Sequence, residues 1–243
     1  MTKRRYRKRA DSSIQSFRRP LTTRGEPGSA ILVVTEGVNT EPAYFNLLAE
    51  RFAAPTVELV PYGAGRGDPR ALADEALRLA TERKQKSKAK KLGINRLESF
   101  DSIWIVFDTD VLNSQKRHDG IAYAHSEGIH VAYSEPCFEY WLLLHGKFTT
   151  AQMPKCKDVL PYLKEVFGWE SYARDGKKAD AVEALLAPLI EKIKLRQAGK
   201  NAQQVRTYHE KADTPFPANP STDVDQLLIT INAAVSPANK FLK

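Results

Sequence analysis

The chain has 243 residues, of which 42% are hydrophobic and 27% charged, a composition that suits a globular domain with its own core. No apolar stretch approaches the roughly 18 residues that a membrane span requires, and the charged N-terminus lacks the apolar core of a signal peptide. We therefore expect a cytoplasmic protein without a membrane segment.

The net charge of +8 is concentrated at the N-terminus. Residues 1–24 hold nine basic side chains against one acid, which leaves 28 basic and 28 acidic residues in the rest of the chain. Such an arm can condense onto nucleic-acid phosphates without sequence preference, or it can be a solvated tail. The candidate nucleic-acid-binding residues of the arm are Lys3, Arg4, Arg5, Arg7, Lys8 and Arg9.

The only cysteines, Cys137 and Cys156, are too few for a disulfide framework. We expect both to be reduced.

Apolar runs and helical spacings alternate through the first half of the chain. Buried strands are predicted at 30–34, 56–62, 103–107 and 129–133, and helices at about 42–52, 72–79, 121–126 and from 136 onward. Alternating strands and helices predict a parallel sheet covered on both faces, which is a Rossmann-like α/β sandwich. Ligands of such sheets gather beyond the carboxyl ends of the strands.

Beyond residue 146 the spacing predicts helices at 159–167, 182–193 and 224–231, the last capped by Ser221 or Thr222, after a stiff proline-rich connector at 214–220. We divide the chain into a basic arm (1–28), an α/β core (29–146) and a helical C-terminal extension packed on the core (147–243). The oligomeric state stays open.

Acidic residues directly follow two of the predicted strands. Glu36 follows the first, and Asp108 and Asp110 follow the third, so a parallel sheet would bring all three to one edge. Carboxylate oxygens are the ligands that Mg²⁺ and Mn²⁺ prefer. The alternative is that the aspartates only cap a turn and that Glu36 is a solvated loop residue.

A glycine-rich segment at 63–69 follows the second strand. Its amides and Arg66 could approach a phosphate, but it lacks the Lys-Ser/Thr of a P-loop, so ATP binding is not indicated. A turn before Asp68, which would cap the next helix, is the reading we favour.

Several phrases resemble the RloB family. They lie at 31–37, 39–45, 104–110, 134–145 and 219–222, and the most distinctive reads Phe-Glu-Tyr-Trp-Leu-Leu-Leu-His at 138–145. The resemblance implies a TOPRIM-like domain in an abortive-infection or phage-defence protein of the AbiLii type, paired with an AAA-type ATPase.

The same resemblance implies roles for residues. Glu36 would be the general acid or base, Asp108 and Asp110 would hold the metal, and Glu139 could complete the acidic group. Thr40, Glu41, Glu135 and His145 are supporting motif residues, although asparagine is common in the family where this chain has Glu135. His145 is more often a structural donor than a catalytic group.

The sequence therefore favours a nuclease that uses Mg²⁺ or Mn²⁺ to cut DNA or RNA in bacterial antiphage defence. The alternative is a non-catalytic sensor module that binds nucleic acid or a partner protein.

Overall fold

The computed structural model describes residues 30–52, 57–61, 68–89, 100–109, 114–170, 172 and 179–242. The strands are β1 (Ile31–Thr35), β2 (Val57–Pro61), β3 (Ser102–Asp108), β4 (His130–Glu135) and β5 (Ser221–Thr222). The α-helices are α1 (Thr40–Arg51), α2 (Pro69–Ala89), α3 (Ser114–Ser126), α4 (Phe138–Leu143), α5 (Leu160–Phe167), α7 (Ala179–Leu186), α8 (Lys192–Lys211) and α9 (Val224–Ala234). Short 3-10 helices are η1 (Cys156–Asp158), η2 (Ala187–Leu189) and η3 (Pro237–Asn239).

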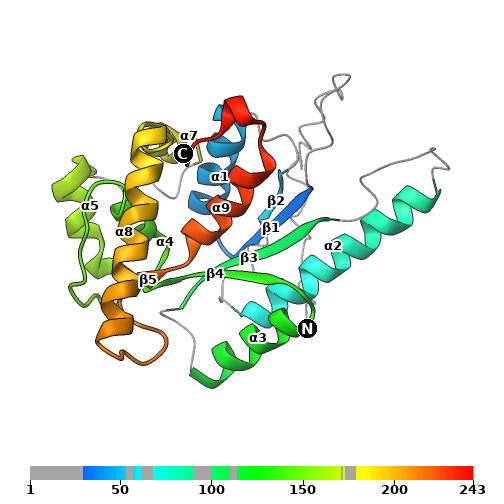
Figure 1. Ribbon diagram of the computed structural model, residues 1–243, viewed down its shortest axis with the longest axis horizontal. Helices are drawn as coiled ribbons and strands as arrows, with labels where there is room; N and C mark the ends of the chain where they lie inside the picture. The colour runs from blue at the N-terminus through cyan, green and yellow to red at the C-terminus, as the bar shows by residue number, and fades with distance from the viewer. Residues whose placement is uncertain are drawn as a thin grey trace, which may run out of the picture.

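The strands form one sheet in the order β2-β1-β3-β4-β5, in which only β5 runs antiparallel to its neighbour (Figure 1). The chain passes from β1 to β2 on one side and then crosses to β3 on the other. This reversal is a topological switch point, where loops diverge and open sheets bind their ligands. The predicted Rossmann-like α/β fold is thus confirmed, with its switch point at the carboxyl ends of β1 and β3.

Alternate residues of β1 point to opposite faces of the sheet, as strand geometry requires. Ile31 and Val33 enter a larger core with helices α1, α4, α8 and α9, whereas Leu32 and Val34 enter a smaller core with α2 and α3. All four side chains are buried, and burial of each contributes roughly 1.5–3 kcal/mol. Helices therefore cover both faces, and the carboxyl edge carries the polar residues.

The C-terminal region differs from the prediction in three places. The helix predicted at 182–193 is wrong, because α7 ends at Leu186 and the extended backbone of Glu191 separates it from α8. Helix α8 was missed because only two of its six buried residues, Leu195 and Val205, are large and apolar, which gives a weak periodic signal. Ser221 and Thr222 form β5 instead of capping a helix, although the hydroxyl of Thr222 does accept the N–H of Val224 at 3.3 Å.

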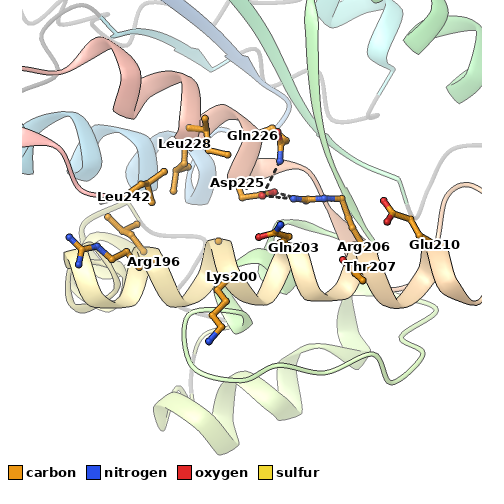
Figure 2. A pocket seen from close by; sticks show the side chains of 13 residues that line it. Arg196, Lys200, Gln203, Arg206, Thr207, Glu210, Asp225, Gln226, Leu228 and Leu242 are labelled. Carbon is orange, nitrogen blue, oxygen red and sulfur yellow. Dashed lines mark hydrogen bonds and ion pairs between the residues drawn. The ribbon is translucent and has the colours of Figure 1, made fainter.

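Helices α8 and α9 border a groove of about 520 Å³ (Figure 2). Within it, Arg206 of α8 makes a bidentate ion pair with Asp225 of α9, with N–O distances of 2.7 and 2.6 Å. The lining also includes Arg196, Lys200 and Leu228. Neither helix, nor any other in the described ranges, combines the length and apolar character needed to cross a bilayer.

Candidate functional site

The ends of β1 and β3 are joined through Glu36 and Asp108. The N–H of Glu36 donates to the carbonyl of Val106 at 2.9 Å, which extends the pairing of the two strands by one residue. The side chain of Glu36 then turns back, and its Oε2 accepts the N–H of Asp108 at 3.0 Å. The structure therefore brings Glu36 and Asp108 together at one edge of the sheet, as predicted.

The start of α1 brings Glu41 to the same edge. Its Oε1 accepts the N–H of Gly37 at 3.1 Å, so the carboxylate lies directly against the backbone of the β1–α1 turn. A Cβ at Gly37 would fall 2.2 Å from the nearest carboxylate oxygen of Glu41, which is closer than atoms can approach. A side chain at position 37 would therefore require the Glu41 carboxylate to move. Thr40, the preceding residue, is buried and its hydroxyl lies 3.2 Å from that of Tyr172.

The start of α4 contributes a fourth acid. The N–H of Phe138 donates to Oδ1 of Asp108 at 2.9 Å, which ties the first residue of α4 to the end of β3. Oε1 of Glu139, the next residue, accepts the hydroxyl of Tyr172 at 3.0 Å. We refer to Glu36, Glu41, Asp108 and Glu139 as the acidic cluster.

Burial and mutual repulsion raise the pKa values of two acids of the acidic cluster. Burial raises the pKa of Glu41 to about 7, and the charges of Glu139 and Glu36 act in the same direction. Burial, reinforced by the charges of the other three acids, also raises the pKa of Asp108 well above its ordinary value. The N–H of Phe138 opposes that shift but does not cancel it. Carboxylates in such surroundings repel one another unless protons or a cation compensate.

Glu135, at the end of β4, has a different environment. Its Oε2 accepts the hydroxyl of Thr109, and its Oε1 accepts the amide of Asn219 at 2.9 Å. Asn219 also bonds both the N–H and the carbonyl of Met153, at 2.7 and 2.8 Å. Glu135 thus links the end of β4 to the residue after β3 through one oxygen and to the loop before β5 through the other.

His145 lies in the core. Its Nδ1 is 3.1 Å from the carbonyl of Trp141 and its Nε2 is 3.0 Å from the hydroxyl of Tyr44. A carbonyl only accepts, so Nδ1 carries the proton and Nε2 accepts from the tyrosine. Burial lowers the pKa of His145 to about 4, so the imidazole is neutral at pH 7. These contacts give His145 a structural role.

Several predicted residues lie outside the described part of the chain. They are Asp110, Arg66 and the basic residues Lys3, Arg4, Arg5, Arg7, Lys8 and Arg9. Of the glycine-rich segment, Asp68 is described, and its Oδ1 accepts the N–H of Arg70 at 3.0 Å. This contact agrees with the prediction that Asp68 caps the following helix.

Sequence reasoning did not nominate Tyr172 or Arg117. Tyr172 connects Thr40 to Glu139 from a segment far along the chain. Arg117 is buried on α3, and its Nη1 donates to the carbonyl of Thr109 at 3.2 Å, which places a guanidinium beside the residue after Asp108. Neither residue belongs to a motif or a periodic pattern that would have singled it out.

The expectation that both cysteines are reduced is wrong for this structure. Cys137, at the N-cap of α4, and Cys156, the first residue of η1, form a disulfide. The β4–α4 turn and η1 come together around Glu139, and this proximity could not be read from a separation of 19 residues in the sequence.

The sequence model of one protein family, described as RloB-like protein, matches residues 31–231. The chain belongs to the RloB-like family. The matched span holds the whole sheet and every residue of the acidic cluster, and it confirms the resemblance drawn from the motif phrases. No curated protein and no solved structure matches this RloB-like chain.

The donors of the acidic cluster are chemically suited to a hard divalent cation such as Mg²⁺ or Mn²⁺. A cation there would offset the repulsion that raises the pKa values of Glu41 and Asp108. Within the described ranges, the one trio of potential ligands with donor atoms within 4.8 Å of one another is Cys137, Glu139 and Cys156. Three carboxylates of the cluster would therefore have to draw closer together to share an ion.

Proposed function

We propose that this RloB-like chain is a cytoplasmic nuclease that depends on Mg²⁺ or Mn²⁺, hydrolyses phosphodiester bonds of DNA or RNA, and acts in bacterial antiphage defence as the effector of a system with an AAA-type ATPase. One observation carries the proposal. Four acids from two strand ends and two helix starts lie near the switch point of the sheet and act on one another electrostatically, with raised pKa values for Glu41 and Asp108. The TOPRIM-like resemblance of the motif phrases supports it.

The acids at the switch point would have different roles in this reaction. Asp108 and Glu139, together with Asp110, would hold the cation, which when bound would neutralise charge on the phosphate oxygens. Glu36 is fixed by the N–H of Asp108 and would move a proton to or from the attacking or leaving oxygen. Glu41, whose pKa is about 7, can store that proton near neutral pH.

The direct test is cleavage by the purified chain, with and without an ATPase partner. Single-stranded and double-stranded DNA and RNA are incubated with Mn²⁺ or Mg²⁺, and products are resolved on denaturing gels. Glu36→Gln and Asp108→Asn should each lower the rate by about 100-fold or more. Glu165→Gln, at an exposed position on α5, should keep the wild-type rate. Cleavage that persists in both site variants excludes this site.

The basic arm is tested separately by deleting residues 1–24. The truncated chain should bind nucleic acid more weakly at low salt, and its affinity should depend less steeply on salt, because fewer phosphate contacts release fewer counterions. Its thermal unfolding should be unchanged. Binding curves that coincide with those of the full chain would remove the arm from the proposal.

The second candidate function is a non-catalytic sensor that binds nucleic acid or a partner protein. The favouring observation is that Glu36, Glu41 and Asp108 each accept a backbone N–H that links two segments, as structural acids do. An inactive wild type that still binds nucleic acid tightly in the presence of the ATPase would favour this function.

A further inference from the structure

The disulfide lies at the edge of the acidic cluster. Cys137 directly precedes Phe138, whose N–H donates to Asp108, and it lies two residues before Glu139. Cys156 approaches Glu139 from η1. Both ends of the disulfide are therefore attached to elements that position acids of the cluster.

The contact between Cys156 and Glu139 must change with oxidation state. Sγ of Cys156 lies 3.2 Å from Oε2 of Glu139, within hydrogen-bond distance for sulfur. A thiol carries a proton that can be donated to the carboxylate, whereas a disulfide sulfur has no proton to donate. Reduction thus gives Glu139 a donor in addition to Tyr172, and oxidation removes it.

The two sulfurs also differ in accessibility. Cys137 is fully buried, whereas Cys156 is partly exposed. An external disulfide can therefore reach Cys156 first, and Cys137 is positioned to resolve the product.

We propose that Cys137 and Cys156 form a reversible thiol–disulfide switch that acts on the acidic cluster through Glu139, with a small disulfide of the glutathione class as oxidant. The Cys156 thiolate attacks one sulfur of oxidised glutathione, which breaks its S–S bond and releases one glutathione thiolate. The Cys137 thiolate then attacks the Cys156 sulfur of the mixed disulfide and releases the second. Two electrons pass to glutathione, and the two cysteine protons end on the released thiolates.

Redox equilibrium tests the switch without reference to activity. The full chain is equilibrated at fixed ratios of reduced to oxidised glutathione, free thiols are alkylated, and their number is read by mass spectrometry. Both thiols should disappear together as the ratio falls. Because the Glu139 carboxylate favours the protonated thiol over the disulfide, Glu139→Gln should raise the equilibrium constant for disulfide formation about tenfold.

Two further variants serve as controls for this equilibrium constant. Glu139→Asp withdraws the carboxylate by one methylene and should shift the constant in the same direction by less, and Glu165→Gln should leave it unchanged. Equal constants for the wild type and both Glu139 variants, or two free thiols at every ratio, overturn the proposal.

The consequence for catalysis rests on the proposed function and is measured separately. The reduced and the oxidised wild type should cleave nucleic acid at rates that differ by about fivefold or more. Cys137→Ser retains the Cys156 thiol but cannot close the disulfide, so its rate should not respond to the glutathione ratio. Equal rates for the two wild-type forms would overturn the link to the acidic cluster. If no form cleaves, the nuclease proposal fails, while the equilibrium constants still decide the switch.

Discussion

The acidic cluster and the groove between α8 and α9 both surround carboxylates with protein, but they balance the charge in different ways. In the groove, the buried Asp225 receives two charge-assisted hydrogen bonds from Arg206 (Figure 2). Arg206 also donates to the carbonyl of Thr222. In the cluster, Glu41 and Asp108 accept backbone N–H groups, and the neighbouring charges that act on them are those of other acids. The Arg206–Asp225 ion pair stabilises the fold. The like charges of the acidic cluster repel one another, and a bound cation would relieve this repulsion.

The largest effect on stability is expected where the charges are matched. Arg206→Ala leaves the Asp225 carboxylate buried without its cation and should lower the free energy of unfolding by about 3 kcal/mol. Urea unfolding followed by circular dichroism measures it. Lys200→Ala removes an exposed cation from the same helix and should change stability by less than about 0.5 kcal/mol. Similar losses in the two variants would contradict the comparison.

In the acidic cluster, removing a charge should instead stabilise the folded chain. Glu41 has a pKa of about 7 in the folded chain against 4.5 as its ordinary value, so the folded state holds a proton that the unfolded state has lost. Its contribution to stability is complete below pH 4.5 and is lost as pH rises through 7. Glu41→Gln, which can still accept the N–H of Gly37, should therefore be more stable than wild type by up to about 3 kcal/mol at pH 8 in EDTA.

The two proteins should differ little in stability near pH 4.5. Thermal unfolding across this range checks the prediction, with Glu50→Gln at an exposed position of the same helix as the matched control. If the stabilities of Glu41→Gln and wild type depended on pH in the same way, the pKa of Glu41 would not be raised in the folded chain.

An intermediate effect is expected at Glu135, whose oxygens both have donors. Asn219→Ala removes one of these donors and both hydrogen bonds to the backbone of Met153, and should cost about 2 kcal/mol. Urea unfolding of this variant, beside Asn46→Ala at an exposed position on α1, gives the difference. No loss in Asn219→Ala would mean that this network does not hold the loop before β5.

The comparison also explains what could be predicted from the sequence. Continuous apolar runs identified four strands, and parallel topology then placed Glu36 and Asp108 at one edge, because strand direction alone fixes where carboxyl ends meet. These inferences need only local patterns and one rule of topology. Glu41 and Glu139 were named only through the family resemblance, and their places near Glu36 and Asp108 come from the structure.

Contacts between distant segments could not be predicted in this way. Tyr172 reaches Thr40 across 132 residues, and the Cys137–Cys156 bond depends on how η1 folds back onto α4. Helix α8, which supplies Arg206, was missed because its buried face mixes alanines and polar residues with only two large apolar side chains, which gives little hydrophobic periodicity. The Arg206–Asp225 pair was therefore hidden from the sequence, while the meeting of Glu36 and Asp108 was not.

The smallest effect distinguishes the two regions by ligand instead of by mutation. If the acidic cluster takes up a divalent cation, Mg²⁺ at about ten times its dissociation constant should stabilise the folded chain by about 1.4 kcal/mol at pH 8, since only the folded state holds the carboxylates together. Differential scanning calorimetry at constant ionic strength, with NaCl replacing MgCl₂ in the reference, separates this gain from general screening. Asp108→Asn should lose most of it. Arg206→Ala, although less stable overall, and Glu127→Gln, in the exposed turn after α3, should keep it in full. A gain that is the same in Asp108→Asn would place the cation elsewhere and leave the acids at the switch point without the ligand that their repulsion favours.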